Sequence, residues 1–177
     1  MDLAPLPGVD IVHDLLDFPW PFKDRSFGHI YCSHVLEHVP HYIGNGQRKD
    51  GLILVMEEMH RILRPGGTVT IVAPHHRGDN RWIDPTHTRA IHPGNFAYFD
   101  PTLHPQEDYY STARFRTLDF EVTYWSYRGV GVLPIGKKRH GLFDHLRWRL
   151  PFLAPLLRSE PMEVRVRLKK FNPLETA

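Results

Sequence analysis

The stretch Met56-Glu57-Glu58-Met59-His60-Arg61-Ile62-Leu63-Arg64-Pro65-Gly66-Gly67, followed by Thr68 to Pro74, decides the fold of this chain. Apolar residues recur at helical spacing along one face, which predicts an amphipathic helix with Asp50 as its N-cap: Leu52, Val55, Met56, Met59, Ile62 and Leu63. Proline and the two glycines end this helix and turn the chain. The β-branched run from Thr68 to Ala73 then predicts a strand.

Two further apolar runs lie upstream of the helix. Phe27 to Ser33 lacks strict alternation, which favours a buried strand with helices over both faces of a parallel sheet. Together with the helix and the following strand it forms a strand–helix–strand unit, expected to be a right-handed parallel crossover. Val9 to His13 is a shorter run that predicts another buried strand.

The order of these segments resembles class I S-adenosylmethionine-dependent methyltransferases. The residues that carry the resemblance are Val9 to Leu15, Phe18-Pro19-Trp20-Pro21-Phe22, Ser26 to Ser33, His34 to Val39 and Met56 to Pro74. The resemblance covers about residues 2–127. It implies a Rossmann-like α/β fold with a mostly parallel sheet and an antiparallel edge strand, and S-adenosylmethionine as the cofactor.

The same resemblance implies a strand, a glycine-rich turn and a helix ahead of Asp2. The glycine-rich turn normally lets the backbone approach the cofactor closely, and such a unit takes about 30 residues. This chain carries no such motif. We therefore expect a truncated version of the fold.

Ligands of open α/β sheets bind beyond the carboxyl ends of the strands. The resemblance implies that Asp14 accepts a hydrogen bond from the adenine amine while the Leu15 N–H reads a ring nitrogen. Ser33 and His34 would contact the methionine part, and Asp2 would bind both ribose hydroxyls.

Each of these assignments has a plainer alternative. In the alternative interpretation, Asp14 is a carboxylate that caps a turn. Asp2 is then part of a disordered terminus. Glu37 and His38, in the segment Leu36 to Val39, are more simply interpreted as helix-start or loop groups than as ligand contacts.

Catalytic candidates come from the irregular stretch of residues 75–112. His75 follows the predicted strand, and Asp84 could orient His87 as a general base for a substrate hydroxyl or amine. The alternative is that Asp84-Pro85-Thr86-His87 forms only a turn. Trp82 to Arg89 and Phe96 to Phe99 resemble a substrate-side segment of a bacterial and phage branch of these enzymes.

The histidines of this stretch could also bind a metal, with His75, His76, Asp84, His87 and His92 as candidate ligands. Their spacing matches no standard helical pair, so we assign no metal ligand. Aromatic side chains here either wall a substrate pocket or form a local core: Trp82, Tyr98, Phe99, Tyr109 and Tyr110.

The C-terminal third predicts two strands. Phe115 to Tyr127 forms one, and Met162 to Leu168 alternates apolar and charged residues, as a strand with one wet face does. Residues 137–161 are expected to form an amphipathic insertion containing a short helix from Gly141 to Leu150. Its apolar patch could contact a membrane surface or a partner subunit, although packing under the sheet edge is the simpler expectation.

Composition sets the outer limits. A chain of 177 residues suits a single domain. The net charge of +2 and one short basic cluster, Lys137-Lys138-Arg139, give no strong nucleic-acid signal. No apolar run is long enough to span a bilayer, and Cys32, the only cysteine, suits a reducing cytoplasm.

The sequence therefore predicts methyl transfer from S-adenosylmethionine to an oxygen or nitrogen of an unknown acceptor. The mechanism would be in-line displacement, with reactant alignment supplying most of the catalysis. Two other functions stay open: a catalytically degenerate methyltransferase-like binding module or fragment, acting alone, as a homo-oligomer or with a partner subunit, and a metal-dependent hydrolase built on the histidine loop.

Overall fold

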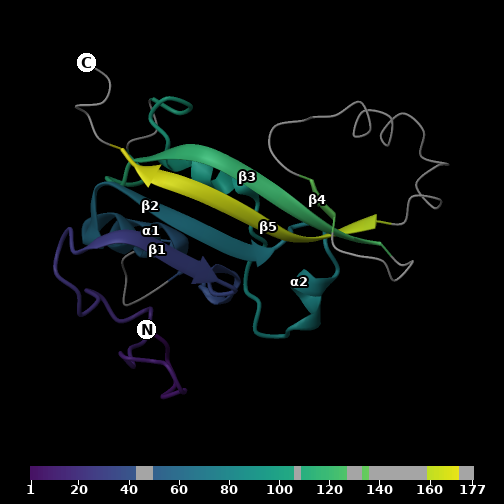
Figure 1. Ribbon diagram of the computed structural model, residues 1–177, viewed down its shortest axis with the longest axis horizontal. Coiled ribbons are helices and arrows are strands. Elements are labelled where there is room, and N and C mark those ends of the chain that lie inside the picture. The colour runs from purple at the N-terminus through teal and green to yellow at the C-terminus, as the bar shows by residue number, and fades with distance from the viewer. Residues whose placement is uncertain (43–49, 106–108, 127–132, 136–158, 172–177) are drawn as a thin grey trace.

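The computed structural model describes residues 1–42, 50–105, 109–126, 133–135 and 159–171. One five-stranded sheet organises the chain, in the order β1-β2-β5-β3-β4 (Figure 1). Its strands are β1 (Phe27–Ser33), β2 (Leu63–Pro74), β3 (Phe115–Ser126), β4 (Leu133–Ile135) and β5 (Ser159–Lys170). β1 and β2 are parallel, whereas the other three neighbouring pairs are antiparallel. The predicted mixed α/β fold is confirmed.

Helix α1 (Gly51–Ile62) forms the crossover between the two parallel strands. The Asp50 side chain accepts a hydrogen bond from the Leu52 N–H at 2.8 Å, as the N-cap prediction required. β2 begins directly at Leu63, and Gly66 adopts a left-handed φ of 74° that few other residues tolerate. The buried face of the helix packs on the sheet and carries Leu52, Val55, Met56, Met59 and Ile62.

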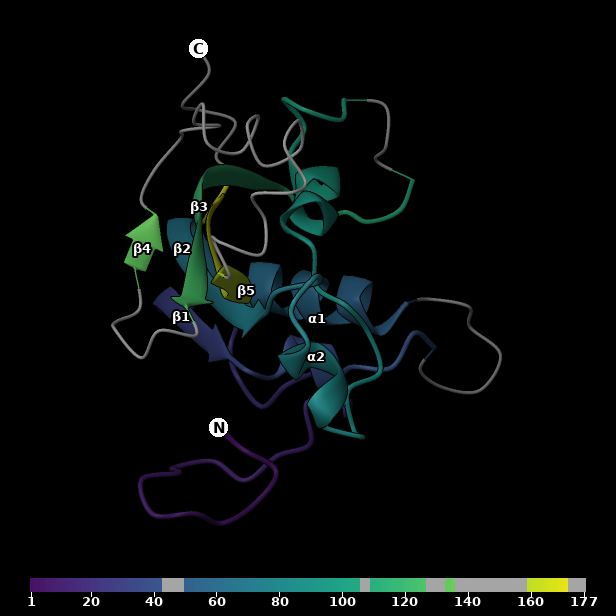
Figure 2. The same cartoon turned by 90° about the vertical axis from the view of Figure 1, so that its right-hand side faces the viewer.

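The antiparallel part of the sheet is larger than the single edge strand that the sequence predicts. β5 lies between β2 and β3 rather than at an edge. The predicted alternation holds, since Val164, Val166 and Leu168 are buried whereas Arg165 and Arg167 are exposed. The core therefore lies between the middle strands and α1. In Figure 2, α1 and the short helix α2 (Asn80–Ile83) lie on the same side of the sheet.

The predicted buried strand at Val9 to His13 is wrong. This segment makes a single parallel bridge, between Asp2 and Val12, and Val12 is 53% exposed. A strand needs a paired neighbour that accepts and donates its backbone hydrogen bonds and covers its side chains. Within the described part of the chain, Val9 to His13 has no such neighbouring strand. β1 is accordingly an edge strand, with Tyr31 exposed. The expected cover on both of its faces is wrong as well.

The long irregular stretch of residues 75–112 contains two short helices. They are α2 and the 3-10 helix η2 (Pro93–Phe99), whose N-cap His92 accepts a hydrogen bond from the Gly94 N–H at 2.9 Å. Most of the predicted insertion of residues 137–161, with its helix, its apolar patch and the basic cluster, lies outside the described residues. Within the described ranges, every helix is too short or too polar to cross a bilayer.

Candidate functional site

A cavity of about 720 Å³ lies between the N-terminal segment and the free edge of β1. All five residues that the sequence assigned to the cofactor line it: Asp2, Asp14, Leu15, Ser33 and His34. The volume is in the range of typical ligand pockets, roughly 300–1,000 Å³. Apolar side chains supply much of the remaining wall, including Leu16, Trp20, Phe22, Ile30, Tyr31, Val35 and Met59.

Turns shape the outer wall of this cavity. The Asp2–Val12 bridge is held by two backbone hydrogen bonds, from Asp2 N–H to the Ile11 carbonyl at 3.1 Å and from His13 N–H to the Asp2 carbonyl at 2.9 Å. One oxygen of Asp14 accepts from the Leu16 N–H at 2.9 Å, so Asp14 does cap a turn. A carboxylate accepts through both oxygens, so this turn leaves Asp14 acceptor capacity for a ligand.

The proline-containing loop at residues 17–26 is fastened to α1 by one ion-pair network. Arg61 donates to the Phe22 carbonyl at 2.7 Å and to the Trp20 carbonyl at 3.1 Å. Glu58 accepts from Arg61 and from the Trp20 N–H at 3.0 Å. The Trp20 ring is 4% exposed and its indole N–H donates to the Leu15 carbonyl at 2.9 Å. A single helix surface thus orients both the loop and one cofactor candidate.

His34 marks the carboxyl end of β1. Its φ of 53° lies in the left-handed region, which costs a non-glycine residue energy and often accompanies functional sites. Its N–H donates to the Val72 carbonyl at 2.9 Å, which anchors the turn to β2. Its ring contacts Glu163 through Nε2 at 3.0 Å and Glu37 through Nδ1 at 3.3 Å.

The side chains of Asp84 and His87 do not form the hydrogen-bonded pair that the sequence suggested. One Asp84 oxygen accepts from the Thr86 N–H at 2.8 Å and the Thr86 hydroxyl at 2.6 Å, which is the geometry of the turn alternative. The Asp84 carboxylate oxygen Oδ2 lies 3.9 Å from His87 Nε2, too far for a hydrogen bond, and the two residues are joined only by the His87 N–H, which donates to the Asp84 carbonyl at 3.2 Å. Their roles as catalytic groups stay predictions.

His75 directly follows β2, is buried, and is not among the residues that line the large cavity. Burial, followed by the positive charge of neighbouring His76 and Arg77, lowers the pKa of His75 to about 4. The same causes, with His92 and Arg81 among the charges, lower the pKa of His76 to about 4. Both rings are therefore neutral at pH 7, and His75 Nδ1 accepts from the Arg77 N–H at 3.1 Å.

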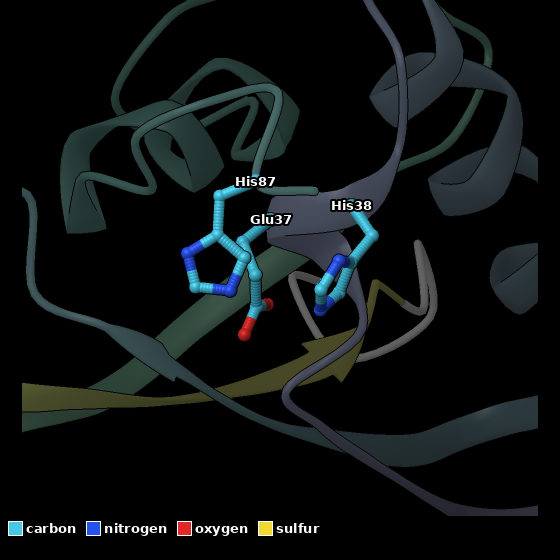
Figure 3. Close-up of side chains that lie close together, drawn as sticks. All are labelled: Glu37, His38 and His87. Atoms are coloured by element: carbon cyan, nitrogen blue, oxygen red, sulfur yellow. The ribbon is translucent and has the colours of Figure 1, made fainter. Parts of the chain in front are cut away.

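A different group of side chains lies close together just past the carboxyl end of β1. Glu37 and His38, from the 3-10 helix η1 (Leu36–His38), lie beside His87 (Figure 3). The sequence interpretation passed over Glu37 and His38 as loop groups. The sequence signal was their position directly after a strand, between two apolar residues. Leu36 and Val39 are buried, and Glu37 between them is buried as well.

A second cavity, of about 350 Å³, lies between α1 and the irregular stretch of residues 75–112. Three of the five predicted pocket aromatics line it: Tyr98, Phe99 and Tyr110. Trp82 does not, since it is 69% exposed and its ring lies against the Arg81 guanidinium. The aromatic residues thus form part of a pocket, but a smaller one than the cofactor candidates line.

Comparison with known proteins bears on this arrangement. Residues 4–71 match the family model described as a methyltransferase domain. That match includes every cofactor candidate except Asp2. This partial match agrees with the resemblance to methyltransferases that the sequence indicated. No sequence among curated proteins matches it.

One solved methyltransferase structure shares the fold at a TM-score above 0.5, and others are more distantly similar. A methyltransferase from Archaeoglobus fulgidus aligns over 90% of this chain and 66% of its own, with 15% identity and a TM-score of 0.52. The YcgJ protein of Bacillus subtilis has 14% identity over 90% of this chain and 70% of its own, with a TM-score of 0.47. A Mesorhizobium loti methyltransferase has 15% identity, 92% and 72% coverage, and a TM-score of 0.40. The chain thus spans just under two thirds of the Archaeoglobus protein.

Proposed function

We propose that this chain binds S-adenosylmethionine in the 720 Å³ cavity and transfers its methyl group to an oxygen or nitrogen of an acceptor. The observation that carries the proposal is the convergence of Asp2, Asp14, Leu15, Ser33 and His34 on one cavity. These residues are separated by up to 32 positions in the sequence, yet they face the same space.

The residues present fit such a nucleoside. Asp2 and Asp14 each use one carboxylate oxygen in a turn, toward Ala4 N–H at 3.0 Å and Leu16 N–H at 2.9 Å. Each carboxylate can still accept from hydroxyl or amine donors. Apolar walls around Leu15 and Ile30 suit the faces of an aromatic base.

S-adenosylmethionine supplies an electrophilic methyl group on a sulfonium centre. The chain's contribution would be to hold both reactants in line and to exclude water, which can account for most of the acceleration of such a displacement. Ser33 and His34 stand at the carboxyl end of β1, where the reacting end would lie. His75 or His87 would take the acceptor's proton if the acceptor approaches from the histidine loop.

Calorimetric titration of the whole chain with S-adenosylhomocysteine tests the proposal. We expect saturable binding in the micromolar range. Asp14→Ala should weaken it by roughly 10- to 100-fold, because a hydrogen bond to a charged group contributes about 1.5–3 kcal/mol. Asp10→Ala is the matched control, since Asp10 is exposed in the same segment and outside the cavity lining.

Two outcomes would overturn the proposal. Absence of binding at millimolar ligand would leave a catalytically degenerate binding module as the better description. Equal affinity of the Asp14→Ala and Asp10→Ala variants would move the ligand out of this cavity.

A further inference from the structure

Glu37, His38 and His87 bring three metal-ligating atoms together outside the residues assigned to catalysis and cofactor binding, His87 excepted. One carboxylate oxygen and one imidazole nitrogen from each histidine all lie within 4.8 Å of one another. Figure 3 shows the Glu37 carboxylate directed between the two imidazole rings. Atoms bound about 2.1 Å from one ion lie at most about 4.2 Å apart, so small side-chain rotations bring the set to coordination distance.

The tautomer of His87 is fixed by its surroundings. Its Nδ1 lies 2.8 Å from the Arg81 carbonyl oxygen, which can only accept a hydrogen bond. Nδ1 therefore carries the proton, and in the neutral ring Nε2 keeps its lone pair. A histidine that donates to a backbone carbonyl through one nitrogen and presents the other is the usual arrangement of a metal ligand.

The tautomer of His38 is also fixed, through two linked hydrogen bonds. The Thr86 hydroxyl donates to Asp84 at 2.6 Å, so its oxygen accepts from His38 Nδ1 at 2.9 Å. His38 Nε2 is then left with a lone pair. The Asp84–Thr86 turn thus supports His38 from outside the group, and the Asp84 carboxylate lies 3.9 Å from His87 Nε2 without bonding it.

Glu37 points to a ligand independently of the histidines. It is 1% exposed, and neither of its carboxylate oxygens has a hydrogen-bond partner among the described residues. Its one charged contact there is His34 Nδ1 at 3.3 Å, which neutralises it only when His34 is protonated. A buried carboxylate without partners is unfavourable, and a cation between Glu37 and the two imidazoles would satisfy it.

The loop that carries His87 is held against η1 by its backbone. The Glu37 carbonyl accepts from the N–H groups of Thr88 at 2.8 Å and Arg89 at 3.2 Å. The Arg89 guanidinium, almost fully buried, donates to the Val39 carbonyl at 2.6 Å and to Asp50 at 2.8 Å. The three ligating side chains are therefore positioned before any ion binds.

We propose that Glu37, His38 and His87 form a binding site for a divalent transition-metal ion. Two imidazoles and a carboxylate suit zinc, manganese or iron(II), and disfavour calcium and magnesium, which prefer all-oxygen sets. With three protein ligands, at least one coordination position stays open to solvent or to a ligand. His38 also lines the 720 Å³ cavity, so the ion borders that space. The site requires neither cofactor nor acceptor.

Titration of tag-free, chelator-treated protein with Zn²⁺ against a competing chromophoric chelator tests the site. We expect one tight equivalent per chain. Glu37→Gln and His87→Gln should each weaken it by at least about 100-fold, and Thr86→Val by about 10-fold, because outer partners of a ligand typically contribute 10- to 100-fold. His29→Gln, an exposed histidine outside the group, is the matched control and should leave the affinity unchanged.

Thermal unfolding of the metal-free variants separates the site from a simple ion pair. If the metal is the partner of Glu37, Glu37→Gln removes an unpaired buried charge, so the melting temperature of the metal-free protein stays or rises. If protonated His34 is the partner, Glu37→Gln and His34→Gln both lower it, and zinc affinity is unaffected by either.

Any of three results would overturn the proposal: no tight equivalent, an affinity insensitive to both Glu37→Gln and Thr86→Val, or a loss on His76→Gln equal to that on His87→Gln. The last result would move the metal to the neighbouring histidines. Thr86 is exposed, so its variant keeps the test valid if a ligand variant fails to fold. S-adenosylhomocysteine binding is measured separately and can fail without affecting this outcome.

Discussion

Two apolar runs in this chain, Val9 to His13 and Val69 to Ala73, look alike in sequence and have opposite fates. The second lies in β2 between β1 and β5, and Val69, Ile71 and Ala73 are 1% exposed or less. The first makes one bridge, and Val12 is 53% exposed. The difference is the presence of paired strands on both sides, which a run of apolar residues cannot supply for itself.

The two regions also differ in what they contribute to stability and to the candidate site. The middle strands with α1 contain most of the buried side chains, whereas the N-terminal segment contributes few of them but lines the large cavity. Regions that are loosely held are the ones available to move around a ligand. Substitutions in the two regions should therefore affect different measurements.

The largest effect should come from Phe115→Ala in β3. Phe115 is fully buried and packs edge-on against the His60 ring at a centroid distance of 5.4 Å. Removing a buried phenylalanine side chain typically costs about 3–5 kcal/mol. Urea unfolding followed by circular dichroism would measure the loss. A loss below about 1 kcal/mol would show that this part of the sheet is not the core.

A smaller loss is expected at the end of α1. The Lys170 ammonium donates to the His60 carbonyl at 2.8 Å and the Leu63 carbonyl at 3.0 Å, where the helix leaves its last carbonyls unpaired. Lys170→Met should destabilise the fold by about 1–3 kcal/mol. Arg165→Met, on the exposed face of the same strand, should cost under about 1 kcal/mol in the same assay. Equal losses would refute the capping role.

The pH dependence of stability should reveal the buried histidines. Burial, followed by the charges of Lys170 and Arg114, lowers the pKa of His60 to about 4, and those of His75 and His76 are also about 4. The unfolded chain binds these protons below about pH 6.5 and the folded chain only near pH 4. Stability should therefore fall as pH decreases from 6.5 toward 4, by on the order of 1 kcal/mol per histidine after allowance for solvent.

Unfolding free energies at pH 7 and pH 5 check this expectation. The His60→Gln variant should show a smaller difference between the two pH values than the wild type. A wild-type stability that is flat over this range would contradict the assignment of neutral buried rings.

The smallest effect should follow Val12→Ala. Because Val12 is exposed and its bridge is made by backbone groups of Ile11 and His13, the unfolding free energy should change by no more than about 0.5 kcal/mol. Urea unfolding beside the Phe115→Ala variant gives the direct comparison. A change of several kcal/mol would mean that the N-terminal segment belongs to the cooperative core.

Local sequence signals predicted the regular elements well. The helix with its Asp50 cap, the strand from Thr68, and the alternation from Met162 to Leu168 all depend on neighbours a few positions away. Spacing and residue type therefore suffice for them. The prediction at Val9 to His13 was wrong because a strand depends on partners that local sequence does not reveal.

The candidate site, too, could be predicted only in part. The resemblance singled out Asp2, Asp14, Leu15, Ser33 and His34, and the structure brings all of them to one cavity. The grouping of Glu37 and His38 with His87 could not be predicted, because 49 positions separate His38 from His87.

The sequence by itself determined the strand–helix–strand unit, the cap and turn residues, and the resemblance to methyltransferase domains, because each is encoded in residues close together along the chain. Only the tertiary structure decided that β5 lies inside the sheet, that β1 is an edge, and that a buried carboxylate faces two imidazoles. These features depend on which distant segments pack together, and that is settled by burial and backbone pairing over the whole domain.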